Sequence, residues 1–345
     1  MTRLPTAFAI GSRRVSGEDP PLVVAEIGIN HGGDPALCAR MIEAAAAAGA
    51  DAVKLQTVDP DESYVQGTPS YAEFRGTTFG DDELARLARL ADALNVLLFS
   101  TPGDFVSLMR IARLGLPAVK ISSGLVTNVP LIAAAARLGV PLIISTGLAY
   151  EHEIAQAVET ARTHGATGVA LLKCTALYPA PDETANLTAI RALQERFGVP
   201  VGYSDHTVDD LAPIASVAFG ATIIEKHFTL DRSLPGADHR ISMEPTPFAE
   251  MVKRIRRLER MRGDTRIGPV PEEERLRSIR HRCLVARRQI VAGERFTAEN
   301  IALKRPLAGR RGLSPQHYER VLGCAAAHAL EKDDPITSQS VAGFV

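Results

Sequence analysis

Short apolar runs recur between residues 22 and 226, and each is followed by a turn and an Ala- and Leu-rich stretch. β-Branched and apolar residues stand together in these runs without alternation, which is typical of parallel strands buried on both faces. The predicted strands are Leu22–Ile27, Ala52–Gln56, Val96–Ser100, Ala118–Ile121, Pro141–Ser145, Val169–Lys173, Val199–Tyr203 and Thr222–Lys226. The predicted amphipathic helices include Pro35–Ala48, Asp81–Leu94, Tyr150–His164, Asn186–Phe197 and Val208–Phe219.

Repeated strand–helix units over a span of this length favour a closed (β/α)8 TIM barrel, which takes about 250 residues. An open, doubly wound sheet is the alternative, and it predicts a GxGxxG turn after the first strand. The segment that follows that strand, Gly28–Gly33, reads GINHGG and does not match the pattern. We therefore interpret the first part of the chain as a barrel.

The pattern changes after the helix predicted at Pro247–Arg262. We place a catalytic barrel domain at 1–262, a linker rich in Gly, Pro and charge at 263–282, and a small β-rich domain at 283–345. Within the last domain the sequence predicts strands and one-turn helices at Leu284–Ala286, Ala325–Ala329, Thr297–Asn300 and Pro315–Val321.

Composition narrows the classes of function. The net charge is −1, aromatic residues make up 5% and Trp is absent, so neither nucleic acid nor a membrane surface is an expected partner. There is no apolar run of about 18 residues and no apolar signal-peptide core at the N-terminus, so we expect a cytoplasmic protein. The four cysteines are scattered and form no CxxC pair, which favours reduced thiols.

Polar residues gather where the predicted strands end. Barrel active sites lie at the carboxyl ends of the strands, so these residues are the first place to look for chemistry. The set comprises Glu26, Lys54, Gln56, Lys120, Ser123, Tyr178, Ser204, His206, Glu225 and His227.

Lys54 and Lys120 stand within otherwise apolar strands. A buried ammonium group is costly unless an anion meets it. One alternative is that each lysine pairs with a carboxylate such as Glu26 or Glu225. The other, which we favour, is an anionic substrate carrying phosphate or carboxylate, with hydroxyls such as Ser204 adding hydrogen bonds.

His206 and His227 end two neighbouring strands. A single histidine is more often a structural residue, but a pair of imidazoles on rigid elements beside Glu225 favours a divalent metal. In the following loop, Asp238 and His239 either contact a polar substrate or cap a turn, and the residues alone do not decide between these.

Together these groups predict a reaction class. Cationic side chains would hold an anionic donor, a metal would polarise a carbonyl, and Glu26 is available for proton transfer. This combination fits the formation of a carbon–carbon bond between a phosphorylated or carboxylated donor and an aldehyde. It does not fit a serine hydrolase, since there is no nucleophile elbow.

The ordered motifs resemble those of the sialic acid synthase family, whose members condense phosphoenolpyruvate with an N-acylated hexosamine to give nine-carbon 2-keto acids. The resemblance covers nearly the whole chain, including a C-terminal segment (284–306) similar to the antifreeze-like SAF domain. Its motifs are AEIGINHGGD (25–34), VKLQT (53–57), FSTP (99–102), VKISSG (119–124), IISTG (143–147), KCTALYPAP (173–181), GYSDHT (202–207), EKHFTLD (225–231) and PGADHRIS (235–242).

The resemblance implies roles for individual residues. It implies that phosphoenolpyruvate is bound by Lys54, Lys120, Ser123 and Ser204, that a divalent metal (Mn2+, with Mg2+ or Co2+ as substitutes) is bound by His206 and His227, that Glu26 and Glu225 are catalytic, and that the amino sugar is bound by Gln56, Tyr178, Asp238 and Arg305. Arg305 would reach the barrel of a second subunit, which implies a domain-swapped homodimer with residues 263–282 as the crossover.

The chain departs from the family pattern on the sugar side. Leu125 stands where a Glu is usual in members that make the common sialic acid, and Ala176 stands where Asn or Ser is common. Gly103-Asp104 follows the STP motif in place of an aromatic residue, and the loop Leu307–Gly312 is longer than the family's glycine-rich turn. We therefore expect a nonulosonic acid synthase, either for N-acetylneuraminate or for a deoxy-diacetamido relative such as legionaminic or pseudaminic acid, and Leu125 favours the relatives.

Two other functions remain open. A different phosphoenolpyruvate-dependent aldose condensation, as in octulosonate or heptulosonate phosphate synthesis, would require an arginine cluster for the terminal phosphate of the sugar, and the barrel loops show little of it. A sugar-binding homologue without turnover is allowed by Leu125 and Ala176. The retention of Glu26, both lysines and both histidines argues against it.

Overall fold

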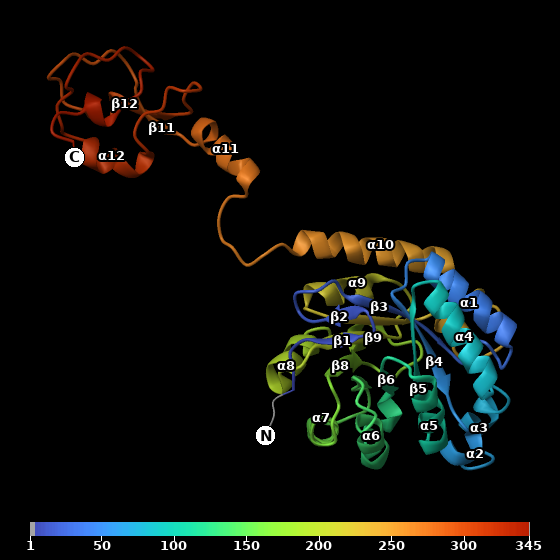
Figure 1. Ribbon diagram of the computed structural model, residues 1–345. Helices are drawn as coiled ribbons and strands as arrows, with labels where there is room; N and C mark the ends of the chain where they lie inside the picture. Colours follow the sequence, from blue (N-terminus) through green and yellow to red (C-terminus); the bar gives the residue numbers. More distant parts are fainter. Residues whose placement is uncertain (1–3, 345) are drawn as a thin grey trace. The chain divides into compact units, whose positions relative to one another are not determined.

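The computed structural model describes residues 4–344 and divides into two compact units, the first ending at Gly263 and the second beginning at Asp264 (Figure 1). The first unit is a closed barrel of parallel strands, as the apolar runs predicted. In order around the barrel the strands are β3 (Leu22–Gly28), β4 (Ala52–Thr57), β5 (Leu97–Pro102), β6 (Val119–Ile121), β7 (Leu142–Ser145), β8 (Val169–Cys174), β9 (Val201–Asp205) and β10 (Ile223–His227), with β10 pairing back onto β3.

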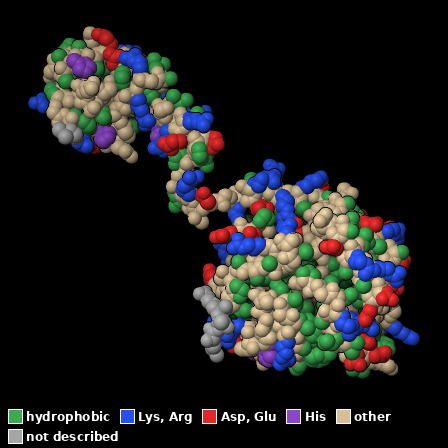
Figure 2. Space-filling model, in the orientation of Figure 1, with side chains coloured by type: hydrophobic (Ala, Val, Ile, Leu, Met, Phe, Trp, Pro, Cys, Tyr) green, Lys and Arg blue, Asp and Glu red, His purple; other side chains and the backbone are tan. Residues whose placement is uncertain are grey.

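Helices surround the barrel and bury their apolar faces against the strands (Figure 1). They are α1 (Pro35–Ala47), α4 (Asp81–Ala93), α5 (Phe105–Leu114), α6 (Val129–Ala136), α7 (Glu151–Thr163), α8 (Ala189–Phe197), α9 (Leu211–Ala218) and α10 (Pro245–Arg262). In α10 the buried residues are Phe248, Met251, Val252 and Ile255. Its basic side chains face outward with acidic ones among them, as Figure 2 shows, so no single-signed surface results.

Two short helices were not predicted. Helices α2 (Pro60–Ser63) and α3 (Pro69–Phe74) lie between β4 and α4. Neither has a buried residue, so neither carries the apolar period from which helices are recognised. Each begins with a capping side chain and a proline in its first turn, Asp59 with Pro60 and Thr68 with Pro69.

A small hairpin, also unpredicted, closes the amino-terminal end of the barrel. Strands β1 (Phe8–Ile10) and β2 (Arg13–Val15) pair antiparallel, and Phe8 and Ile10 pack among residues of the barrel interior such as Leu22 and Phe99. The Phe8 ring lies so close to Gly168 that a Cβ there would be 2.3 Å from it. The lower barrel is therefore apolar and filled, and polar chemistry is confined to the opposite end.

The second unit has its own core around Leu284, Phe296 and Ile336. Its elements are α11 (Pro271–Arg280), β11 (Cys283–Ala286), β12 (Ile301–Lys304), the 3-10 turns η4 (Pro315–His317) and η5 (Ser338–Ser340), and α12 (Tyr318–Val321).

Three details of this unit differ from the prediction. The residues expected as a helix at Thr297–Asn300 form a turn, held by the Asn300 side chain accepting from the Thr297 amide at 2.7 Å. The strand expected at Ala325–Ala329 is reduced to isolated bridges at Ala325 and Ala326. The segment expected as a linker contains α11. Within residues 4–344, no helix is both long and apolar enough to cross a membrane.

Candidate active site

Side chains at the carboxyl ends of the barrel strands line one cavity of about 290 Å³. Successive strand residues point to opposite faces, so the inward positions of each strand meet in the barrel axis. The predicted site residues that line it are Glu26, Lys54, Gln56, Lys120, Ser123, Tyr178, Ser204, His206, Glu225 and His227. The sequence therefore identified most of the cavity wall.

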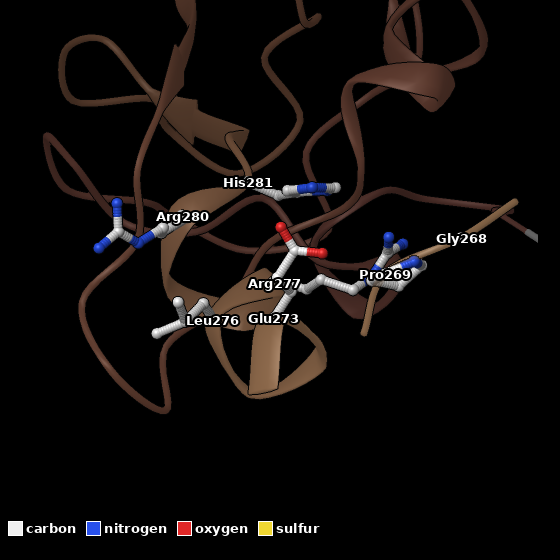
Figure 3. Close-up of a pocket in the computed structure, with 7 residues that line it drawn as sticks. All are labelled: Gly268, Pro269, Glu273, Leu276, Arg277, Arg280 and His281. Carbon is white, nitrogen blue, oxygen red and sulfur yellow. The ribbon is translucent and has the colours of Figure 1, made fainter. Parts of the chain in front are cut away.

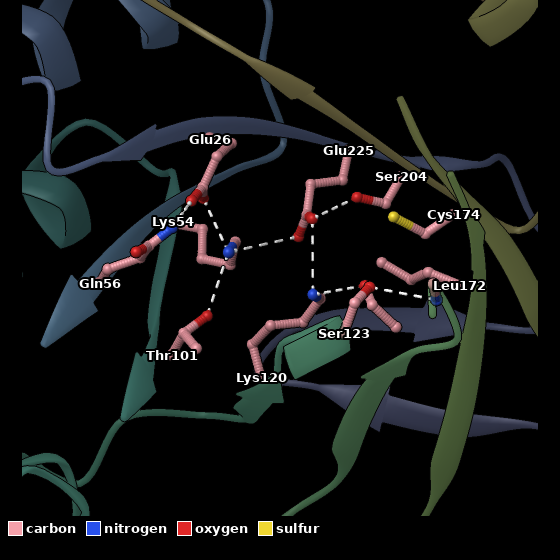
Figure 4. Close-up of polar contacts among 12 residues, drawn as sticks. Glu26, Lys54, Gln56, Thr101, Lys120, Ser123, Leu172, Cys174, Ser204 and Glu225 are labelled. Atoms are coloured by element: carbon pink, nitrogen blue, oxygen red, sulfur yellow. Dashed lines mark hydrogen bonds and ion pairs between the residues drawn. The ribbon is translucent and has the colours of Figure 1, made fainter. Parts of the chain in front are cut away.

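Glu225 is the centre of a buried charge network (Figure 4). Its carboxylate lies 3.5 Å from the Nζ of Lys120 and 3.7 Å from the Nζ of Lys54, and it accepts a hydrogen bond from the Ser204 hydroxyl at 2.8 Å. Lys54 also contacts Glu26 at 2.9 Å. The pairing of lysines with glutamates, which the sequence left open as an alternative, is thus present.

The two carboxyl groups have different proton affinities. Burial raises the pKa of Glu26 to about 6, and repulsion from Glu225 adds to this while Lys54 opposes it. Burial also acts on Glu225, but attraction from Lys120 and Lys54 outweighs it and holds the pKa at about 2. Such a divergence separates the roles of two neighbouring carboxyl groups, since one stays ionised and the other exchanges a proton near neutral pH.

The two lysines also differ. Burial lowers the pKa of Lys120, and the attraction of Glu225 offsets only part of that. The pKa of Lys54 is raised, because attraction to Glu225 and Glu26 outweighs its burial. Each ammonium also donates to a hydroxyl, Lys54 to Thr101 at 3.0 Å and Lys120 to Ser145 at 2.7 Å.

His206 and His227 lie next to each other, with ring centroids 5.2 Å apart. The Nδ1 atom of His206 is 2.7 Å from the carbonyl oxygen of Thr175, and an Nδ1–H that donates there leaves Nε2 as a free acceptor. Burial, with repulsion from His206 and Lys54, lowers the pKa of His227 well below its ordinary value. His227 is therefore a neutral imidazole.

These imidazoles fit a divalent cation. The Nδ1 of His227 is buried without a hydrogen-bond partner, and it lies 3.5 Å from an Asp238 carboxylate oxygen. Neutral imidazole nitrogens are suitable metal ligands. In the part of the chain that the structure describes, no three His, Cys, Asp or Glu side chains cluster as metal ligands, so two imidazoles alone would leave several coordination positions for substrate and water.

Tyr178 lies against both histidines. Its ring centroid is 4.1 Å from that of His206, and it meets His227 edge-on at 6.1 Å. The loop that carries it is fastened to the same strand end, because the amide of Ala180 donates to the carbonyl of His206 at 2.9 Å. Tyr178, expected beside the sugar, is thus also a wall of the imidazole pair.

Arg305, also expected beside the sugar, lies in the second unit. It borders a cavity of about 330 Å³ there, together with Lys304, Arg310 and Lys332. Arg305 is therefore not among the residues that line the barrel cavity.

Sequence reasoning missed several cavity residues. Ser145 and Cys174 line the cavity, and Thr101 contacts Lys54 from β5. All three stand at strand ends, which is the signal that could have identified them. They were passed over because STP and STG are weak motifs, and because a single cysteine in an apolar run is most often a buried thiol.

Of the departures from the family pattern, Ala176 lies at the barrel cavity. Ala176 and Leu148 line the cavity, and Leu148 is 79% exposed, whereas Leu125 packs against the apolar core. Gly147 donates its amide to the Ser123 hydroxyl at 3.1 Å, and a Cβ there would lie 2.6 Å from that oxygen. This side of the cavity therefore presents apolar groups next to the hydroxyls.

A larger cavity, of about 580 Å³, lies beside α11 in the second unit (Figure 3). Gly268, Pro269, Glu273, Leu276, Arg277, Arg280 and His281 line it. Glu273 there caps the start of α11 by accepting from the amide of Val270 at 3.2 Å. Glu273 therefore serves the helix, and the barrel cavity, where the predicted site residues meet, is the candidate active site.

Comparison with known proteins supports this interpretation of the site. A model of the NeuB family matches residues 41–266, more than half of the chain. The chain belongs to the NeuB family. A SAF domain model matches residues 281–342 of this NeuB-family chain, in the second unit. Both elements of the resemblance seen in the sequence are thereby confirmed.

Individual relatives cover almost the whole NeuB-family chain. An N,N'-diacetyllegionaminic acid synthase of Campylobacter jejuni is 36% identical over 91% of this chain and 98% of its own length. A protein of Methanocaldococcus jannaschii without an assigned activity is 37% identical over 95% and 96% of the two chains. The crystal structure of an N-acetylneuraminic acid synthetase from Leptospira borgpetersenii aligns with a TM-score of 0.76 and 34% identity, covering 80% of this chain and 96% of that one.

Proposed function

We propose that this NeuB-family protein is a nonulosonic acid synthase. It condenses phosphoenolpyruvate with an N-acetylated hexosamine, with consumption of one water molecule, to give a nine-carbon 2-keto acid and inorganic phosphate. The observation that carries the proposal is the single barrel cavity in which two buried lysines, two glutamates of different pKa and two adjacent imidazoles meet. These groups, together with its relatives, support an activity as a phosphoenolpyruvate-dependent transferase.

In this proposal the lysine side of the cavity binds the donor. Lys54 and Lys120 supply positive charge for the phosphate and carboxylate of phosphoenolpyruvate, and Ser123 and Ser204 supply hydroxyl donors. Glu225 contacts both lysines, so an arriving anion competes with a carboxylate that Ser204 also holds. Phosphoenolpyruvate would share the two ammonium groups with Glu225 and would not displace the Glu225 carboxylate.

The imidazole side would hold the metal. His206 and His227 would supply imidazole nitrogens for a divalent ion, Mn2+ first and Mg2+ or Co2+ as substitutes. When bound, such an ion polarises the aldehyde carbonyl of the open-chain sugar. Tyr178 and Asp238, which contact these histidines, would orient the sugar beside them.

Glu26 would handle the proton. Its pKa of about 6 lets it exchange a proton at neutral pH, and the Nε2 of Gln56 donates to its Oε1 at 3.1 Å. Gln56 would thereby hold the carboxyl group in place and face the sugar. Glu225 stays ionised and balances the lysines.

The acceptor we favour is a less hydroxylated, N-acetylated hexosamine. Ala176 stands where Asn or Ser is common in the family, and together with Leu148 it presents methyl groups to the cavity. Relatives that act in the synthesis of N,N'-diacetyllegionaminic acid and pseudaminic acid are 34 to 36% identical to this chain. An acceptor carrying a second acetamido group and a methyl group in place of hydroxyls would suit these surroundings.

The assembly belongs to the same proposal. Arg305 would enter the barrel of a partner subunit and contact the acyl group of the sugar, which makes the enzyme a domain-swapped homodimer in the cytoplasm. Support for this is the unpaired Arg305 side chain, for which the described residues offer no ion-pair partner, at the edge of a cavity of the SAF unit.

Phosphate release from phosphoenolpyruvate tests the function. The full-length protein is supplied with Mn2+ and a panel of free hexosamines, 2,4-diacetamido-2,4,6-trideoxyhexoses and sugar phosphates, and phosphate is followed by a coupled assay. The proposal predicts sugar-dependent release that is fastest with a diacetamido sugar. Release with a sugar phosphate alone would favour an aldose phosphate condensation, and no release with any acceptor would refute the synthase assignment.

A further inference from the structure

Lys226 is also buried at the carboxyl end of the barrel, and it has no part in the reaction described above. It lies on β10 between Glu225 and His227, and it is paired in register with Asp205 of β9. Ser204 and His206 flank Asp205 in the same way. Because side chains alternate along a strand, the flanking four face the cavity while Lys226 and Asp205 face away from it.

The Lys226 ammonium closes the turn that carries His206. It donates to the Asp205 carboxylate and to the carbonyl oxygens of Thr207 and Asp209, the last at 3.1 Å. Asp205 in turn accepts from the amide and the hydroxyl of Thr207 at 3.1 and 3.0 Å. Neither side chain of the ion pair has any exposed surface.

A fully buried ion pair is weak evidence for stability. Its desolvation offsets most of its attraction, and replacing such a pair by apolar groups is often neutral. Fixing one arrangement of the chain is a better-supported role. Here the pair joins the two strands one position away from each imidazole, and it determines where His206 lies relative to His227.

We propose that Lys226 and Asp205 are positioning residues, which hold the His206 imidazole at the spacing from His227 that a divalent cation requires. The inference rests on the proposed function, because that function supplies the metal. His206 has two further restraints, from Thr175 on its Nδ1 and from Ala180 on its carbonyl, but both come from the β8 loop. Lys226 ties the turn that follows β9 to the strand of His227, beyond the backbone pairing of β9 with β10 and the hydrogen bond from Ser204 to Glu225.

The test variant is the double substitution D205N/K226M, which removes both charges together and leaves no buried ion alone. Binding of Mn2+ to the full-length protein is measured by electron paramagnetic resonance without substrates, and binding of phosphoenolpyruvate by calorimetry. We expect Mn2+ affinity to fall tenfold to a hundredfold, about the effect of losing an outer contact of a metal ligand. The affinity for phosphoenolpyruvate stays within twofold, because the cavity lysines are untouched.

Arg256→Met is the matched control. Arg256 pairs with Asp51 and donates to the carbonyl of Pro21 at 2.6 Å, so it also joins an ion pair to backbone, but at the amino-terminal end of the barrel. It should lower the melting temperature and leave Mn2+ affinity unchanged. Unchanged Mn2+ affinity in a folded D205N/K226M protein, or an equal loss in R256M, would overturn the positioning role.

A second readout separates this inference from the metal assignment. Histidine labelled with 13C at Cε1 gives a metal-free signal for His206, identified by its loss in a His206→Asn protein. We expect one sharp resonance in the unsubstituted chain and a split or broadened one in D205N/K226M. One sharp resonance in both would overturn the positioning role. If the unsubstituted protein binds no Mn2+ but the His206 resonance still splits or broadens in D205N/K226M, the metal assignment is refuted and the positioning role is kept.

Discussion

Glu26 and Glu225 contact the same lysine, yet their surroundings separate their chemistry. Glu225 lies near two ammonium groups and a serine hydroxyl, which keep it ionised. Glu26 has Lys54 and the Gln56 amide, and this is not enough to offset its burial. In the proposed reaction, proton transfer would therefore fall to Glu26.

Activity should fall as the pH is lowered through about 6. Burial sets the pKa of Glu26 near that value, and below it the carboxyl group is protonated and can no longer accept a proton. Glu26→Gln should lower kcat by about a hundredfold or more and remove this acidic limb from the profile of kcat against pH. An acidic limb that persists in the Gln variant would show that another group is responsible.

Lys120→Met should weaken the binding of phosphoenolpyruvate rather than the binding of the sugar. Loss of a charge-assisted contact of about 1.5–3 kcal/mol corresponds to roughly a tenfold to hundredfold rise in KM for phosphoenolpyruvate. Lys54 remains to pair with Glu225, so the protein should still fold. Steady-state kinetics with each substrate varied in turn would measure this. The control is Arg113→Met, which removes an exposed cationic side chain on α5. A rise in the KM of the sugar alone would contradict the assignment.

At the scale of elements, the barrel was predictable because its strands are buried on both faces. Such strands are continuous apolar runs, as in β7 and β8, and their polar ends stand out against that background. The site residues on β3, β4, β9 and β10 were found for this reason. The hairpin β1–β2, with only three residues in each strand, and the helices α2 and α3, without buried residues, carry no comparable signal.

What the sequence could not give was the pairing inside the cavity. Thr101 and Ser145 look like ordinary strand-end hydroxyls until the barrel closes and places them on the lysine ammonium groups. Leu125 was read as a change in the cavity wall, whereas it packs against the core. Contacts between strands distant in sequence depend on barrel register, which a pattern of apolar residues does not encode.

The hairpin makes a prediction at this scale. Phe8→Ala should destabilise the protein by about 3–5 kcal/mol, because the ring fills the amino-terminal end of the barrel and its removal leaves a cavity. Urea denaturation would measure the loss, and the KM for phosphoenolpyruvate should not change. Phe105→Ala, at a side chain that is 51% exposed, is the control and should be nearly neutral. Equal effects of the two substitutions would contradict the role of the hairpin as a plug.

At the scale of the whole molecule, the proposed active site combines the barrel of one subunit with Arg305 from the SAF unit of its partner. In the proposal the barrel supplies the groups that bind phosphoenolpyruvate and the metal, and Arg305 lies in the SAF unit. If the arginine acts on a partner's barrel, two defective subunits can complement each other.

Mixing Arg305→Ala with Lys120→Met subunits, refolded or coexpressed, should therefore restore activity. In a swapped heterodimer one of the two barrels receives an intact arginine and has its lysine, so activity should exceed that of either variant alone severalfold. The assay is phosphate release with both substrates below saturation. No gain in verified heterodimers would show that Arg305 acts within its own chain or not at all.

The central claim is that the barrel cavity joins phosphoenolpyruvate to an amino sugar. Mass spectrometry of the product formed from [3-13C]phosphoenolpyruvate and a diacetamido hexose tests it most directly. The account predicts a nine-carbon 2-keto acid that carries one labelled carbon, formed in step with phosphate and reduced in the Lys120→Met protein when phosphoenolpyruvate is below saturation. Label found only in phosphoenolpyruvate or pyruvate, with the sugar unchanged, would contradict the account.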